Sequence, residues 1–395
     1  MQALPEIAAF ADDLTAIRQD IHRNPELGFE EHRTAGLIAD RLESWGITVT
    51  RGIGGTGVVG VLDGRGPGPV LGLRADMDAL PMEEATGLPY SSSFQGRFHG
   101  CGHDGHVTML LGAARYLAMT RQFDGRVVFI FQPAEEGLGG ALAMLEDELF
   151  DRFPCDALYG LHNAPELAFG QLEVTSGPAM AGAERFDITI TGKGCHGAKP
   201  QSGRDPLIAG VALVQSLQTI VSRNLDARHP AVLSVTEFRA GTTWNVIPDT
   251  SRLSGTFRFF APEVRDQIMR RMTTLCDATA AGYDVTIEVS FQSISRILIN
   301  DEGAVRNVLM AASDVLGDAA ASRAALPVMG SEDMGDLLAA VPGAFFRLGH
   351  GTGIPLHNPG FRIDDRILPL GASIFARLVE RSTGSSMAPT PLGSQ

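Results

Sequence analysis

Short apolar runs alternate along this chain with longer stretches in which apolar residues recur every three or four positions. The short runs are rich in the β-branched and aromatic side chains typical of buried strands, and they cover 58–62, 70–73, 127–131 and 157–161. The longer stretches have the spacing of amphipathic helices, and they cover 7–21, 107–119 and 140–149. This alternation predicts an α/β fold, with a mixed, mostly parallel sheet covered by helices on both faces.

Polar and charged residues fall just past the predicted strand ends, namely Asp76, Asp78, Glu135, Glu136 and His162. In a doubly wound sheet, the loops that follow parallel strands open into one crevice. We therefore expect these side chains to converge at one edge of the sheet.

The middle of the chain follows a different order. Its pattern predicts a strand, a helix, two strands, a second helix and a last strand, at 184–191, 206–222, 232–238, 252–260, 262–281 and 285–291. This β-α-β-β-α-β order is the ferredoxin-like motif. We predict an inserted α+β domain at 183–295 within an outer domain formed by 1–182 and 296–381, followed by a disordered tail at 382–395.

The composition excludes several classes of partner. With 395 residues, 44% of them hydrophobic, the chain has the composition of a globular protein of more than one domain. Its net charge of -14 and the lack of basic runs disfavour nucleic acid and anionic membranes. No secretory signal and no apolar run of roughly 20 residues are visible, and four scattered cysteines favour a reducing, cytoplasmic compartment.

Cys101 and His103 stand two residues apart on a glycine-containing turn before an apolar helix. A thiolate with an imidazole suits zinc and similar metals better than magnesium or calcium. His106 follows one helical turn later, where a third ligand and a hydrogen-bonded core histidine are equally good interpretations.

Glu135 and Glu136 come directly after an apolar strand that Pro133 terminates. Adjacent side chains in extended backbone point to opposite sides, so one carboxylate would bind metal and the other would face the substrate and move its proton. A lone Glu-Glu pair is more often a solvated acidic loop. The position between a buried strand and the glycine-rich segment 137–140 favours the catalytic interpretation.

Two further histidines are candidate ligands. His162 follows an apolar strand, and His357 lies in a turn-prone loop. Together with the thiol, the first imidazole and one glutamate they make five candidate ligands of mixed N, O and S type. Five are too many for one tetrahedral ion that keeps a position open for water. They fit a two-metal site with ions about 3.5–4 Å apart and a shared water.

The motifs at 73–81, 99–106, 132–137 and 356–359 closely resemble those of the N-acyl-amino-acid amidohydrolases, which include hippurate hydrolase and the indole-acetyl-amino-acid hydrolases. The resemblance runs from about 22 to 378. It implies a di-metal site in the outer domain and a smaller lid domain that also mediates dimerisation. It further implies Glu135 as general base and a ligand set of Cys101, His103, Glu136, His162 and His357.

The same resemblance assigns roles in the inserted domain. His196, in the glycine-rich loop 192–200, would reach the active site of the partner subunit and stabilise the oxyanion. Asn245, in 244–249, would contact the substrate. Arg258 is a candidate for binding the substrate carboxylate, or else a solvated strand residue.

Two acidic residues are expected to support the site without reaching the substrate. Asp78 would orient a metal ligand, and Glu332, in 329–334, would border the site. Many relatives have His-x-Asp where this chain has Asp76-Met77-Asp78, so Asp76 as a ligand is a further alternative.

These observations predict a metal-dependent enzyme that hydrolyses the amide bond of N-acyl-amino acids, hippurate-like or acetylated, to a carboxylic acid and a free amino acid. The expected cofactors are two divalent ions per subunit, chosen among zinc, manganese, cobalt and nickel, and the expected assembly is a homodimer or a higher homo-oligomer. The alternatives are a dipeptidase or carboxypeptidase and a carbamoyl-amino-acid hydrolase. A non-catalytic binding protein is disfavoured because every catalytic position is intact.

Overall fold

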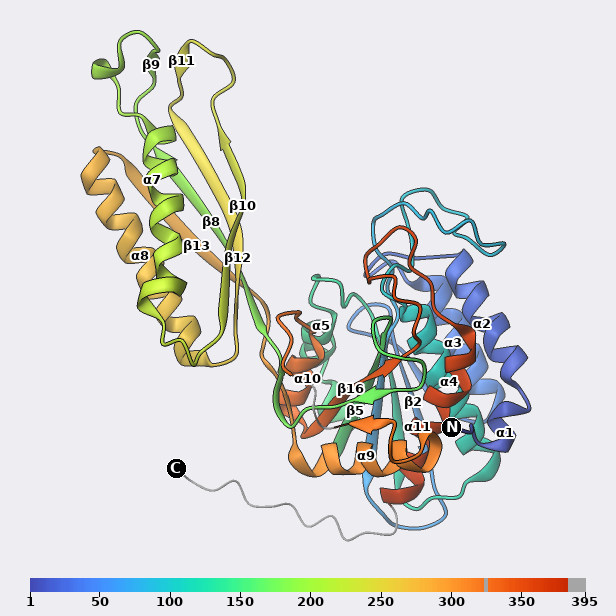
Figure 1. Cartoon of the computed structure of the whole chain (residues 1–395). Coiled ribbons are helices and arrows are strands. Elements are labelled where there is room, and N and C mark those ends of the chain that lie inside the picture. Colours follow the sequence, from blue (N-terminus) through green and yellow to red (C-terminus); the bar gives the residue numbers. More distant parts are fainter. Residues whose placement is uncertain (323–325, 383–395) are drawn as a thin grey trace. The chain divides into compact units, whose positions relative to one another are not determined.

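The computed structural model describes residues 1–322 and 326–382, and the chain divides into two compact units (Figure 1). The first unit comprises Met1–Ala179, Leu298–Leu326 and Asp333–Gln395, and the second comprises Met180–Ile297 and Pro327–Glu332. The sequence places 327–332 in the outer domain, but Met180 bridges Val328 and the N–H of Ala181 donates to the carbonyls of Val328 and Gly330. This backbone pairing joins the segment to the second unit.

The first unit is built on an eight-stranded sheet with the order β1-β2-β4-β3-β5-β16-β6-β15. The strands are β1 (Thr48–Ile53), β2 (Gly57–Asp63), β3 (Val70–Asp76), β4 (Arg126–Gln132), β5 (Ala157–Ala164), β6 (Leu172–Glu173), β15 (Ala321–Ser322) and β16 (Gly343–Gly349). The four central strands β4, β3, β5 and β16 are parallel, while β1, β2 and β6 pair antiparallel with their neighbours on the central side. Beside this sheet, β7 (Gly177–Met180) pairs with β14 (Leu298–Asn300).

Helices cover both faces of this sheet (Figure 1). They are α1 (Pro5–Ala8), α2 (Ala11–Arg23), α3 (His32–Ser44), α4 (His103–Thr120), α5 (Gly140–Glu146), α6 (Leu149–Arg152), α9 (Glu302–Leu316), α10 (Met334–Ala340) and α11 (Leu368–Ser382). Leu73 and Tyr159 belong to one apolar cluster with residues of α4 and α11. On the opposite face, Gly160 lies beneath Met334, whose Sδ would be 2.3 Å from a Cβ at that glycine. The strands are therefore buried on both sides, as the sequence predicts.

Three predicted boundaries are wrong. The helix expected at 7–21 breaks between α1 and α2, because Phe10 takes φ −120° and buries its side chain. The helix expected at 140–149 breaks between α5 and α6, where Glu148 has φ 59°. The disordered tail was expected to start at residue 382, but Ser382 is the last residue of α11. The rest of the expected tail, 383–395, lies outside the described residues.

The second unit has the predicted β-α-β-β-α-β order. Its main elements are β8 (Gly182–Thr191), α7 (Pro206–Thr219), β10 (Ala231–Ala240), β12 (Thr250–Phe259), α8 (Pro262–Tyr283) and β13 (Thr286–Ser295). The strands form an antiparallel sheet in the order β10-β12-β8-β13, and α7 and α8 both lie on one face of it (Figure 1). The side chain of Asp205 caps α7 by accepting from the N–H groups of Leu207 and Ile208.

A small two-stranded ribbon of β9 (Cys195–His196) and β11 (Val246–Ile247) completes the second unit. Among the described helices of the whole chain, none combines the length and the apolar character needed to cross a membrane.

Candidate metal and active site

All five predicted ligands belong to the first unit, and the structure brings them together. The ligand atoms of Cys101, His103 and His162 lie within 4.8 Å of one another, and so do those of Cys101, Glu136 and His357. The two groups share only the thiol. This arrangement offers two adjacent ligand sets joined at one sulfur atom.

Cys101 and His103 are positioned by the start of α4. Gly102 caps this helix with φ 90° and ψ 20°, a left-handed conformation that suits glycine. Cys101 is buried, and its Sγ lies 3.5 Å from Nε2 of His162. Burial raises the pKa of the Cys101 thiol well above its ordinary value, so a neighbouring cation would be needed to favour the thiolate.

Hydrogen bonds orient two of the imidazoles so that each presents Nε2 to the cluster. His103 donates from Nδ1 to Asp78 over 3.1 Å, and His162 donates from Nδ1 to the carbonyl of Asn163 over 2.7 Å. The Nε2 of His103 is buried, and no described residue forms a hydrogen bond with it. Such a nitrogen is costly in a protein interior unless it binds something, so these residues fit a bound metal ion.

Glu135 and Glu136 lie in a turn and not in extended backbone, which corrects the sequence-based expectation. The turn directs both carboxylates toward one imidazole: Oε2 of Glu135 and Oε1 of Glu136 lie 4.0 and 3.9 Å from Nε2 of His103. The N–H of Glu136 donates to Oδ2 of Asp78 over 3.0 Å. Asp78 thus holds the predicted ligand His103 with one oxygen and the glutamate turn with the other.

His357 approaches the cluster from the C-terminal part of the chain. Its φ is 59°, a conformation that non-glycine residues rarely adopt, and its N–H donates to the carbonyl of Gly100. Its Nε2 lies 3.2 Å from Oε1 of Glu136. Burial disfavours the ionised form of Glu136, but His357 and His103 lower its pKa below the ordinary value.

The structure decides between the two interpretations of His106. It is buried, donates from Nδ1 to Asp76 over 2.6 Å and accepts at Nε2 from the N–H of Asn163 over 2.9 Å. Both ring nitrogens are therefore used, as in a hydrogen-bonded core histidine. Asp76, the last residue of β3, accepts from His106 and from Arg74, and its Oδ2 lies 3.9 Å from Nε2 of His103. Through these hydrogen bonds Asp76 holds neighbouring side chains in place, which is the role of a residue that supports the site and is not itself a ligand.

One correction concerns the strand ends. Asp76 is the last residue of β3 and His162 lies inside β5, two residues before its end. The register of β5 against β16 extends as far as Ala164 paired with Gly349, so the strand continues past the histidine. The apolar pattern stops at 161 because the next two side chains are polar: His162 and Asn163 both contact Cys101.

The predicted substrate residues belong to the second unit. His196 is exposed on β9, and the N–H of Gly197 donates to the carbonyl of Asn245, so the ribbon of β9 and β11 holds both residues side by side. Arg258 on β12 is partly buried and donates to Oγ of Ser331 over 2.5 Å. Glu332, the neighbour of Ser331, is buried in the same unit.

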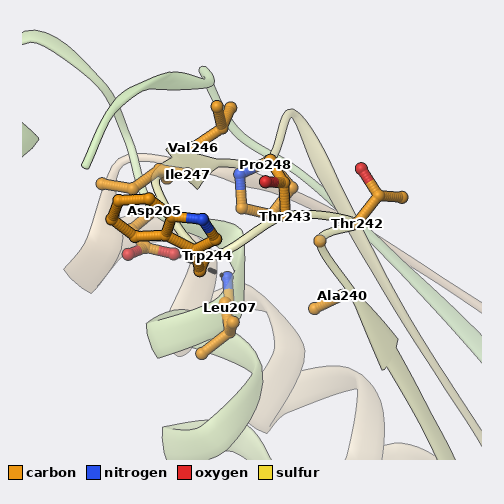
Figure 2. A pocket seen from close by; sticks show the side chains of 10 residues that line it. Asp205, Leu207, Ala240, Thr242, Thr243, Trp244, Val246, Ile247 and Pro248 are labelled. Carbon is orange, nitrogen blue, oxygen red and sulfur yellow. Dashed lines mark hydrogen bonds between the residues drawn. The ribbon is translucent and has the colours of Figure 1, made fainter.

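The second unit also contains a pocket of about 510 Å³ beside the ribbon, lined by the side chains of Trp244, Thr242, Thr243 and seven further residues (Figure 2). The lining residues include none of the predicted site residues. All of its lining residues belong to the second unit.

Sequence reasoning missed several buried polar residues that support the cluster. Asn163 donates from Nδ2 to the carbonyl of Cys101 and accepts at Oδ1 from His350. His22 and His99, which lack the spacing of metal ligands in the sequence, are buried as well. One feature of the sequence could have indicated such residues, namely the polar pair His162 and Asn163 at the end of an apolar run.

This two-unit fold and this cluster of candidate metal ligands are those of a hydrolase that acts on amides. The sequence model of Peptidase family M20/M25/M40 matches residues 72–381, and the chain belongs to this family.

Curated relatives include the hippurate hydrolase of Campylobacter jejuni, 39% identical over 378 residues, which cover 96% of this chain and 98% of the relative. The N-acetyl-L-cysteine deacetylase of Bacillus subtilis is 39% identical over 373 residues, covering 93% and 88%. Among solved structures, a Bacillus subtilis protein described as a dinuclear metal binding peptidase from the M20 family matches with a TM-score of 0.83 and 34% identity. That match covers 95% of this chain and 99% of the other.

Proposed function

We propose that this protein is a two-metal amidohydrolase that cleaves N-acyl-amino acids, hippurate-like or acetylated, into a carboxylic acid and a free amino acid. The observation that carries the proposal is the pair of ligand groups that share Cys101. The names of the two curated relatives, a hippurate hydrolase and an acetylcysteine deacetylase, support the substrate class. A cytoplasmic location stays a prediction from the sequence.

The proposed metal ligands are Cys101, His103, Glu136, His162 and His357. Zinc, manganese, cobalt and nickel all accept a set of one thiolate, three imidazoles and one carboxylate. When bound, two such cations would polarise the amide carbonyl and lower the pKa of a water molecule.

Glu135 is the proposed general base and acid. Its carboxylate takes the proton of the attacking water and delivers it to the leaving amine nitrogen. Its neighbour Glu136 is committed to His357 and to the backbone bond with Asp78. His196 would reach the active site of the partner subunit and donate a hydrogen bond to the developing oxyanion there, while Asn245 and Arg258 would contact the substrate.

The first experiment is an activity screen with protein reconstituted separately with each of the four metals. The substrates are benzoyl- and acetyl-amino acids, dipeptides and carbamoyl-amino acids. We expect the N-acyl-amino acids to have the highest kcat/KM. A preference for dipeptides or for carbamoyl compounds would replace the proposed substrate class with that alternative.

Glu135→Gln tests the mechanism. We expect two metal ions per subunit, as in the wild type, and a kcat that is lower by about 10²- to 10⁴-fold because the amide cannot accept the proton. Metal content by elemental analysis and steady-state kinetics are the measurements. Wild-type turnover in this variant would remove Glu135 as the base.

We further propose that the protein is a homodimer formed through the second unit. Helix α7 contains no charged residue, yet Ile208 and Val211 on it are exposed. Strand β10 forms an edge of the sheet, and Phe238 on it is also exposed. An uncharged helix face beside an unpaired strand edge is typical of an interface.

A further inference from the structure

The turn that carries Glu135 and Glu136 has an unusual backbone. Residues 133–139 lie between β4 and α5 without regular secondary structure. Ala134, directly before Glu135, is buried and has φ 54°. A non-glycine residue keeps this conformation only when surrounding contacts hold it there.

Glu31 supplies such a contact from the N-terminal part of the chain. Its side chain is fully buried, and its Oε1 accepts from the N–H of Ala134 over 2.9 Å. Its Oε2 accepts from Oγ1 of Thr56, in the turn between β1 and β2, over 2.5 Å. Glu31 thereby joins three segments that are distant in sequence.

The backbone near Glu31 also packs closely against the turn. A Cβ at Gly28 would lie 3.0 Å from Cα of Ala134 and 2.7 Å from Cδ1 of Leu138. The turn therefore rests on the 28–31 segment, and the carboxyl group is one of several contacts that define its place.

Asp78 holds the other side of the same turn. Its Oδ2 accepts from the N–H of Glu136, while Glu31 accepts from the N–H of Ala134. The amides immediately before and after Glu135 therefore both end on buried carboxyl groups, each from a different segment. The backbone is therefore held by a hydrogen bond on each side of Glu135.

We propose that Glu31 is a positioning residue for the reaction: its carboxyl group holds the Ala134 amide and thereby directs the side chain of Glu135 toward the ligand cluster. This inference rests on the proposed function, in which Glu135 is the base. Small displacements of a catalytic group are costly, since about 1 Å can reduce the rate roughly 100-fold.

The hydrogen bond between the Glu31 carboxyl group and the Ala134 amide, here called the clamp, persists in either charge state of Glu31. Burial raises the pKa of Glu31 to about 7, so the neutral acid and the carboxylate are both populated near neutral pH. The neutral acid still accepts from Ala134 through its carbonyl oxygen and can donate to Thr56 through its hydroxyl. A glutamine side chain reproduces this hydrogen-bonding pattern, whereas leucine fills the space and accepts nothing.

The experiment compares Glu31→Gln, Glu31→Leu and Glu26→Gln in the metal-loaded enzyme. Glu26 is a matched control because its carboxylate belongs to the same segment and also accepts from backbone N–H groups, but from Arg33 and Thr34 at the start of α3. We expect Glu31→Leu to lower kcat by about 10- to 100-fold, with KM within about threefold of wild type and two metal ions retained. Glu31→Gln should rescue kcat to within about threefold, and Glu26→Gln should leave it unchanged.

A kcat of Glu31→Leu within twofold of wild type would overturn the proposal, as would equal losses in Glu31→Gln and Glu31→Leu. Hydrogen exchange of a peptide covering 133–140 provides a second readout, including for Glu31→Asp, whose shorter side chain should retain folding but lose the Ala134 bond. Faster exchange there supports the clamp, and unchanged exchange contradicts it. If the wild type hydrolyses no N-acyl-amino acid, the proposed function fails while exchange still reports on the clamp.

Discussion

Several residues around the ligand cluster have positive φ, including Gly102 at 90°, Ala134 at 54° and His357 at 59°. Two of these three are not glycine, and each lies within two residues of a proposed ligand or is one itself. Strain of this kind persists only where the surrounding structure determines the backbone, and it concentrates at functional sites. The cluster is thus held by backbone geometry as well as by side-chain chemistry.

Gly102→Ala should disturb the cluster directly. A Cβ there would lie 2.4 Å from Nδ2 of Asn163 and 2.9 Å from Cδ1 of Ile363. We expect a loss of at least about 2 kcal/mol in unfolding free energy and weaker metal binding, because Asn163 also holds the carbonyl of Cys101. Urea denaturation and metal titration measure the two effects.

Gly139→Ala is the matched control. Gly139 caps α5 in the same left-handed conformation, with φ 79° and ψ 38°, and a Cβ there would meet no atom within 4 Å. It should cost about 1 kcal/mol from backbone strain alone. Equal costs for the two substitutions would show that the approach of Asn163 to Gly102 is unimportant.

The choice of Glu136 over Glu135 as a ligand came from the family resemblance. The other candidate ligands could be predicted from residue chemistry, since thiol, imidazole and carboxylate groups at strand ends are few and their combination is specific. The backbone at 134–136 could not, because the apolar pattern ends at Gln132 and nothing local distinguishes extended chain from a turn. The burial of His22 was also invisible, since its partners Asp104 and Glu84 are 82 and 62 residues away.

At the scale of elements, buried charges join α2 to α4. Arg18 and His22 on α2 both bond to Oδ2 of Asp104 in the first turn of α4, at 2.9 and 2.8 Å. His22 also contacts Glu84 over 3.3 Å. These bonds fix the N-terminal end of α4, which is the end that carries His103.

The helix pairing should depend on pH through His22. Burial alone would lower the pKa of His22, but hydrogen bonds with Asp104 and Glu84 raise it to about 9. A pKa raised above the unfolded value of about 6.5 stabilises the fold fully below that pH, and the contribution is lost as pH rises through 9. His22→Gln should therefore lose up to about 3 kcal/mol at pH 6 and much less at pH 9.5.

Urea denaturation at the two pH values measures this difference. His32→Gln is the control, because His32 is exposed at the start of α3 and should show no such dependence. A pH-independent cost for His22→Gln would mean that packing, and not charge, holds the two helices together.

Element types were largely predictable, because the apolar periods of strand and helix differ. The breaks at Phe10 and Glu148 were not, since both residues fit the helical apolar and polar spacing. Tertiary packing decided the first break, since the ring of Phe10 turns into the core. At the second break, Glu148 takes a left-handed conformation between two short helices.

At the scale of the whole molecule, the proposed homodimer predicts that the second unit controls assembly. Val211→Asp places a charge on the uncharged face of α7 and should convert dimer to monomer, as measured by light scattering coupled to size exclusion. Ala278→Asp, on the exposed face of α8, is the matched control and should leave the mass unchanged. A monomeric wild type would refute the assembly itself.

The place of β16 in the sheet has a consequence for biosynthesis. This strand, at 343–349, lies between β5 and β6, so the growing polypeptide must leave a gap in the sheet until nearly nine-tenths of the chain has been translated. Most of the second unit is contiguous and is synthesised during that interval. On the ribosome, the second unit can therefore fold first. During this time the edge of β5 has no partner strand, so chaperones can bind it or it can aggregate.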